Sequence, residues 1–274
     1  MRWILIFTLL AGLLIYGVLG FPYWGDPKSP AATHVSDYYI EQTMADTSVP
    51  NVVTAVLADY RGYDTMFETI VIFTSGLVCI VLLAKTRKTV PTSRVYRHVP
   101  TGITLRIEKG GKLPDDSDVF ERIDSVWVPH DLVIRTTCRI VIPFIQVFAL
   151  YVIAHGHHSP GGGFQGGVIF GASLVLYAIG FNLRALLGRM TRKIIMLIAA
   201  LGVLVYAGLG LSCILFQGNY LDYSVLAPVF GTDPVVARSH GILIVEIGVG
   251  IAVMAVMVIL YTSLSSAGRY DEGL

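Results

Sequence analysis

The chain has 274 residues, of which 54% are hydrophobic and 14% are charged, and its mean hydropathy is +0.67. Soluble domains carry about 25% charged residues, so this composition excludes an ordinary soluble domain. The formal net charge of +1 gives no reason to expect a nucleic-acid partner.

Long apolar runs predict an all-α integral membrane protein with about six transmembrane helices, because a spanning helix needs about 20 mainly apolar residues. The six runs are Trp3–Gly20, Met66–Ala84, Leu132–Ala154, Gly166–Leu183, Ile194–Phe216 and Gly241–Tyr261. A secretory signal peptide is the alternative for the first run. The length of that run, and the lack of a small-residue cleavage site before FPYWG, favour a retained helix.

The basic residues are distributed unevenly between the loops. Fifteen of the twenty lysines and arginines would lie on one side of the membrane, and only Lys28, Arg61 and Arg238 on the other. Cytoplasmic loops are enriched in lysine and arginine. We therefore predict a multi-pass protein of the cell's inner membrane with both termini in the cytoplasm.

The chain divides into two predicted membrane modules joined by a polar linker. Residues 1–88 form the first module, 89–127 the cytoplasmic linker and 128–274 a four-helix module. The linker segment VYRHVPTGITLRIEKGG, residues 95–111, contains enough β-branched residues to favour a small hairpin. It is either a solvated loop or a docking surface for anionic lipid or for another protein of a complex.

Small residues recur at helix-packing spacing in three spans, which indicates a helix bundle. These pairs are Gly167 with Gly171, Gly208 with Ser212, and Gly248 with Ala252. Each cysteine stands alone in a different span, so we expect packing roles and no disulfide for Cys79, Cys138 and Cys213.

Acidic and basic residues surround the start of the second span, in ADYRGYDTMFE. They are Asp59, Arg61, Asp64 and Glu68. Asp64 and Glu68 are four residues apart and share a helix face if the helix begins early. Two neighbouring carboxylates suit reversible proton or cation binding. The alternative is an ordinary helix start stabilised by acidic side chains.

The third span carries Asp131, Arg135 and Arg139 at intervals of four residues, so all three lie on one helix face. Asp131 and Arg135 can pair. Arg139 either extends towards the cytoplasmic surface or needs an acidic partner on another helix or another protein of a complex.

The following turn, HGHHSPGGGFQGG, combines three histidines with a proline and six glycines. A phosphate loop would need a lysine that is missing here. A zinc site using His155, His157 and His158 lacks further ligands. We predict a tight turn at membrane depth, in which His155 and His157 are candidates for proton relay. The predicted turn residues are Pro160, Gly161, Gly162, Gly163 and Gln165.

The last span contains His240 and Glu246, which are separated by 240° around the helix and therefore need separate partners. Glu246 lies deep enough to be a buried acid. It is either part of an ion pathway or the acceptor of a structural hydrogen bond from a neighbouring helix.

Two segments resemble known families. DLVIRTTCRIVIPFIQVFALYVIA followed by HGHHSPGGGFQGGVIFGA is similar to the B-type subunit of Mrp-type multisubunit Na⁺/H⁺ antiporters, over about residues 128–262. The same module occurs in energy-converting membrane-bound hydrogenases and related respiratory complexes. NVVTAVLADYRGYDTMFET, residues 51–69, resembles a segment near the C-terminus of the large A-type antiporter subunit and in a small hydrogenase subunit.

The resemblance implies one component of a large complex, with Glu68 as the leading candidate of an ion or proton pathway. Three functions remain open: participation in the exchange of Na⁺ for H⁺, ion translocation within a hydrogenase or respiratory complex, and a structural scaffold. The partners would be other subunits of such a complex and membrane lipid. The chain has no hydrolytic triad, cysteine cluster or nucleotide motif, so we expect no catalysis and no cofactor.

Overall fold

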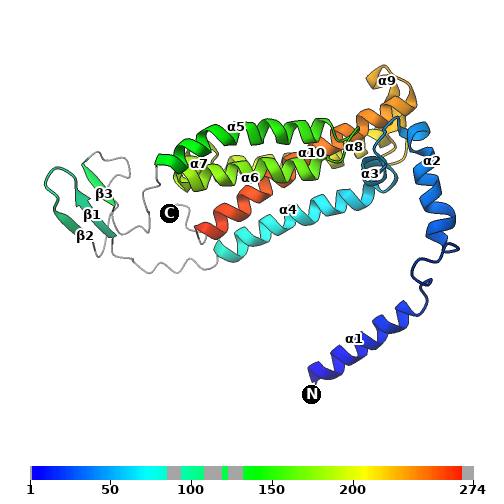
Figure 1. Ribbon diagram of the computed structural model, residues 1–274, viewed down its shortest axis with the longest axis horizontal. Helices are drawn as coiled ribbons and strands as arrows, with labels where there is room; N and C mark the ends of the chain where they lie inside the picture. The colour runs from blue at the N-terminus through cyan, green and yellow to red at the C-terminus, as the bar shows by residue number, and fades with distance from the viewer. Residues whose placement is uncertain (1, 85–93, 108–118, 123–131, 267–274) are drawn as a thin grey trace.

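The computed structural model describes residues 2–84, 94–107, 119–122 and 132–266, and it consists mainly of a bundle of long helices (Figure 1). Five of these helices are long and apolar enough to cross a membrane. They are α4 (Gly62–Ala84), α5 (Leu132–Ala154), α6 (Gly163–Phe181), α8 (Arg192–Leu215) and α10 (Pro234–Ser265). Five of the six predicted spans therefore correspond to long apolar helices, and the all-α membrane class is confirmed.

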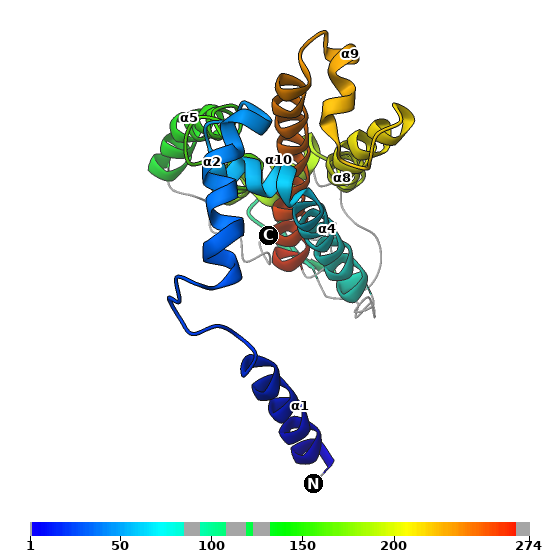
Figure 2. The ribbon, with the colours of Figure 1, turned by 90° about the vertical axis from the view of Figure 1, so that its right-hand side faces the viewer.

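The first predicted span corresponds to helix α1 (Arg2–Val18), which stands apart from the bundle in both views (Figures 1 and 2). Its apolar stretch, Ile4–Val18, is shorter than those of the five long helices. Its large apolar side chains are exposed, as in Ile4 and Leu13. Whether α1 crosses the membrane therefore stays a prediction, and so does the cytoplasmic location of the termini.

Helix α10 forms the centre of the bundle. It packs against α8, α6 and α4. In its most apolar 18-residue stretch 67% of the residues are buried, compared with 17–33% in the other four long helices. Small residues allow these close contacts: a Cβ added to Gly167 would lie 2.7 Å from the Gly250 carbonyl oxygen, and one on Gly202 would lie 2.6 Å from that of Gly248. Gly208, which the sequence also suggested, has no atom within 4 Å of an added Cβ.

The segment between α1 and α4 is largely helical, which the sequence analysis did not predict. It contains η1 (Ala31–Val35), α2 (Ser36–Thr47), α3 (Val52–Ala55) and η2 (Val56–Tyr60). After α8, the chain forms η3 (Tyr223–Leu226) and α9 (Ala227–Phe230). Helices α2, α3 and α9 lie at one end of the bundle (Figure 1).

A small antiparallel sheet lies beyond the opposite end of the bundle (Figure 1). The predicted hairpin is present as β1 (Arg94–His98) and β2 (Thr104–Ile107), with Tyr96 opposite Leu105. A third strand, β3 (Phe120–Arg122), pairs with the other edge of β1 and was not predicted. The short helix α7 (Leu183–Arg189) connects α6 towards α8.

Candidate functional site

A cavity of about 240 Å³ lies where the segment 53–68 meets helices α6, α8 and α10. Two carboxylates line it: Glu68 from α4 and Glu246 from α10. The other polar side chains on its wall are Thr54, Thr65, Gln165 and Tyr206. The cavity thus brings together two acids that are 178 positions apart in the sequence, and most of its remaining lining is apolar.

Glu246 is almost completely buried, with 8% of its surface exposed. The Gly163 backbone amide interacts favourably with its carboxylate. Its Oε2 atom nevertheless has no hydrogen-bond partner among the described residues. A buried carboxylate without a cationic partner is costly when it is ionised, so this oxygen is suited to hold a proton or a small cation.

The glycine-rich turn fits closely around Glu246. Gly162 has φ +127° and precedes the first residue of α6, and a Cβ there would lie 2.6 Å from Glu246 Oε1. A Cβ on Gly163 would lie 1.9 Å from the Glu246 carbonyl oxygen. Glycine at these two positions therefore allows the turn to approach the acid more closely than any other residue would.

The predicted turn differs in extent from the observed one. Helix α6 begins at Gly163, so Gly163 and Gln165 belong to its first turn instead of the loop. Gly163 is needed there for its close approach to α10. Gly161 has a negative φ, and a Cβ there would lie 2.9 Å from the Val152 carbonyl oxygen, whereas Pro160 is exposed in the loop.

Asn51 connects the segment before α4 to this turn. Its side-chain amide donates to the carbonyl oxygens of Gly156 at 2.7 Å and Ser159 at 2.8 Å. Its backbone amide donates to the His157 carbonyl at 2.9 Å, and its Oδ1 accepts the amides that begin α3. The hydroxyl of Thr54 also donates to Gly156, at 2.9 Å. One residue thus caps a helix and fixes the turn.

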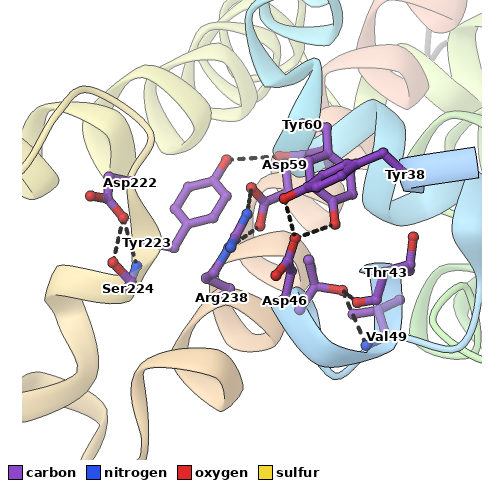
Figure 3. Close-up of polar contacts among 12 residues, drawn as sticks. Tyr38, Thr43, Asp46, Val49, Asp59, Tyr60, Asp222, Tyr223, Ser224 and Arg238 are labelled. Atoms are coloured by element: carbon purple, nitrogen blue, oxygen red, sulfur yellow. Dashed lines mark hydrogen bonds and ion pairs between the residues drawn. The ribbon is translucent and has the colours of Figure 1, made fainter. Parts of the chain in front are cut away.

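A second connection joins α10 to the segment that precedes α4 (Figure 3). Arg238 Nε and Nη2 donate to Asp59 Oδ2 and Oδ1, both at 2.8 Å. The side chain of Asp59 is 8% exposed and that of Arg238 26%. Tyr223 donates to the Ala58 carbonyl at 3.0 Å, and Tyr206 to that of Gly62 at 2.7 Å. Asp59 is therefore a bridging residue between distant parts of the chain and does not line the cavity.

Asp46 lies beside this bridge and accepts hydrogen bonds from two tyrosines (Figure 3). The donors are Tyr60 at 2.7 Å and Tyr38 at 3.1 Å. Burial and the hydrogen bond to the Asp46 carboxylate raise the pKa of Tyr60. Tyr60 therefore remains a neutral donor that holds α2 against η2.

Asp64 and Glu68 lie on the same helix but have different environments. Arg61 pairs with Asp64, with Nη2 and Oδ2 2.5 Å apart, and both side chains are about half exposed. Glu68 forms no ion pair among the described residues and lines the cavity. The two carboxylates are thus in different surroundings: Asp64 belongs to an exposed ion pair, and Glu68 lines the cavity without one in the described part of the chain.

The histidines have distinct surroundings. His155 stacks on Tyr151 with ring centroids 5.0 Å apart, and His240 meets the edge of Phe230 at 5.4 Å. His157 Nε2 is buried without a hydrogen-bond partner in the described residues. Burial lowers the pKa of His157, and the charges of His158 and His240 lower it further. His157 therefore favours its neutral form.

The remaining predictions concern metal and the arginines of α5. In the ranges that the structure describes, no group of three His, Cys, Asp or Glu side chains could hold a metal ion. Arg135 lies 5.9 Å from the centroid of the Phe181 ring, and Arg139 lines a different cavity from that of Glu246. The predicted partner Asp131 lies outside the described residues.

Five structurally important residues were not selected by the sequence analysis: Asn51, Thr54, Tyr206, Tyr223 and Arg238. Asn51 could have been found as a helix cap, because asparagine before an apolar helical segment favours that role. Nothing in the spacing of the others identifies their partners, since each contact joins residues more than 100 positions apart.

Comparisons with known proteins match both parts of the chain. Residues 133–259 match the family described as a domain related to the MnhB subunit of Na⁺/H⁺ antiporter, and residues 12–97 match the MbhE family, a subunit of MBH. A putative antiporter subunit mnhB2 of Staphylococcus haemolyticus is 30% identical over 131 residues, which are 46% of this chain and 92% of that protein. A relative in Methanocaldococcus jannaschii is 27% identical over 173 residues, which are 63% of this chain and 60% of that one.

Two solved structures share the fold. The Mrp complex of a Dietzia species has a chain with a TM-score of 0.52 and 23% identity, covering 92% of this chain and 24% of that one. The membrane-bound sulfane sulfur reductase, an archaeal respiratory membrane complex, has a chain with a TM-score of 0.51 and 23% identity. That match covers 91% of this chain and 94% of that one.

Proposed function

Because the chain belongs to the family of domains related to the MnhB subunit of Na⁺/H⁺ antiporters, we propose that it is a membrane component of a multisubunit monovalent cation/proton antiporter. Other subunits of that complex would be its partners, and Na⁺ and H⁺ the transported ions. The proposal includes no catalytic step and no cofactor. It also keeps the division into modules at residues 1–88, 89–127 and 128–274.

The observation that carries this proposal is the buried carboxylate of Glu246 in a cavity that also contains Glu68. Its unpaired Oε2 can be neutralised by a proton or by a monovalent cation, but not by both at once. Such competition for one site couples the movement of the two ions. Isolated acids inside membrane bundles are expensive and usually belong to ion pathways.

In the proposed pathway, Glu68 receives an ion at the more exposed side of the cavity and Glu246 binds it at the buried side. The hydroxyls of Thr54, Thr65 and Tyr206 also line the cavity. Each donates its proton to a backbone carbonyl, so its oxygen can accept a hydrogen bond from water or coordinate a cation. The turn around Gly162 restricts access to Glu246, since its backbone lies directly against the carboxylate. Neighbouring subunits would continue the route.

The test is exchange by the reconstituted complex in vesicles, measured as a Na⁺-dependent change of internal pH. We expect Glu246→Gln and Glu68→Gln each to reduce exchange more than tenfold while the complex still assembles. Glu41→Gln is the matched control, because Glu41 is an exposed carboxylate on α2 away from the cavity. Undiminished exchange by both cavity variants in a normally assembled complex would contradict the proposed pathway and leave this chain a structural role only.

A respiratory parent complex is the second candidate, favoured by one observation. The chain of the sulfane sulfur reductase complex matches over 94% of its own length, whereas the Dietzia chain matches over 24%. Nearly the whole of this chain therefore has a counterpart in a single chain of similar extent in that archaeal complex. Isolation of the native complex distinguishes the two candidates: iron–sulphur proteins that copurify in fixed proportion would favour the respiratory one.

A further inference from the structure

A cationic groove lies between α5, α6 and α7 and shares no lining residue with the cavity of Glu246. It has a volume of about 450 Å³. Arg139 of α5 and Arg189 of α7 line it, and none of its lining residues is acidic. Neither arginine forms an ion pair with a described residue. The groove thus carries two positive charges that the described part of the chain leaves uncompensated.

The polarity of the groove changes along its length. Gln146 lies seven residues beyond Arg139 on the same face of α5, or about 10 Å further along the helix. Ile142, Pro143 and Leu174 supply apolar wall between and opposite these polar groups. On the same helix, Phe144 is 73% exposed and extends the apolar surface of α5 outward. A ligand matching this order has an anionic head, a polar neck and an apolar tail.

Arginine is well suited to the anionic head. Its planar guanidinium binds phosphate oxygens through two parallel hydrogen bonds. The Arg189 guanidinium lies 5.0 Å from the centroid of the Tyr177 ring, which also lines the groove and holds the cation beside it. Basic pockets between transmembrane helices bind the head groups of anionic lipids.

We propose that this groove binds an anionic phospholipid. The phosphate contacts Arg139 and Arg189, the Gln146 amide donates to an ester carbonyl oxygen, and an acyl chain follows the apolar wall past Leu174. The charge of the groove discriminates against zwitterionic lipid. This site is independent of Glu68 and Glu246, so it can fail or succeed separately from the proposed transport function.

The experiment measures binding of phosphatidylglycerol and phosphatidylcholine to the purified full chain by native mass spectrometry. We expect the double variant Arg139→Gln, Arg189→Gln to bind phosphatidylglycerol roughly 30-fold more weakly, from two lost charge contacts, with phosphatidylcholine binding unchanged. Both arginines are exposed, so glutamine leaves the core packing intact. Lys193→Gln is the matched control, an exposed basic residue on α8 outside the groove, and should stay within twofold of the wild type.

A second variant tests the acyl-chain part of the site. Leu174→Trp keeps both arginines but fills the space beside the apolar wall, and we expect it to weaken phosphatidylglycerol binding as well. In the wild type, millimolar inorganic phosphate should fail to displace the lipid. Equal phosphatidylglycerol binding by the wild type and the double arginine variant would overturn the proposal. Displacement of the lipid by inorganic phosphate would overturn it as well. Normal lipid binding by a double variant that no longer joins its complex would also overturn it, because the groove would then receive an acidic side chain of another protein.

Discussion

The ion pair between Asp59 and Arg238 should stabilise the contact between α10 and the segment before α4 measurably. Replacement of Arg238 by alanine leaves the Asp59 carboxylate, which is 8% exposed, without its cation and without two hydrogen bonds of 2.8 Å. Removal of one partner from a fully buried pair costs about 3–5 kcal/mol. Because Arg238 is 26% exposed and partly screened by water, we expect the free energy of unfolding to fall by about 2–3 kcal/mol.

The assay is a double-mutant cycle of Asp59→Ala and Arg238→Ala, with unfolding in mixed micelles of SDS and a mild detergent followed by circular dichroism. We expect a coupling free energy of about 1.5–2 kcal/mol, within the range found for groups in contact. Arg61 and Asp64 provide a matched control, because they form an exposed ion pair worth less than about 1 kcal/mol. A coupling no larger than that of the control pair would refute the reasoning.

Two further predictions concern the turn around Glu246. Gly163→Ala should lower the free energy of unfolding by about 2 kcal/mol or more, since its Cβ would overlap the Glu246 carbonyl. Gly208→Ala is the control for the same unfolding assay. An added Cβ there meets no neighbouring atom within 4 Å, so this helical variant should raise stability slightly. Because burial lowers the pKa of His157, the unfolded chain binds its proton first as the pH falls; the melting temperature should therefore decline below about pH 6.5, and less so in His157→Gln. An identical decline in that variant would exclude His157 as its source.

The helices of the bundle could be predicted from the sequence because their signal is local. A run such as Ile194–Phe216 is apolar throughout, and α8 occupies nearly the same residues. The segment between α1 and α4 was different: η1, α2 and η2 are short, and both α2 and η2 carry tyrosines and aspartates. Their stability comes from contacts with distant residues, such as Tyr60 with Asp46 and Asp59 with Arg238, and sequence periodicity contains no information on such pairs.

The candidate site was predictable in its components but not in its arrangement. Glu68 and Glu246 were each identifiable as acids in apolar surroundings, and the glycines after Pro160 indicated a tight turn. What the turn approaches could not be read from spacing, because more than 80 residues separate Gly163 from Glu246. Likewise, Asp64 was grouped with Glu68 by helical spacing, although its ion-pair partner is Arg61, three residues earlier.

The central position of α10 has a consequence for biogenesis. Roughly 150 residues separate α4 from α10, and at about 5–20 residues per second their synthesis takes about 8–30 seconds. Until then, the surfaces of α4, α6 and α8 that later pack against α10 are exposed to lipid, and Asp59 lacks its ion-pair partner Arg238. The contacts that α10 makes with α4, α6 and α8 can therefore form only after α10 itself has been synthesised.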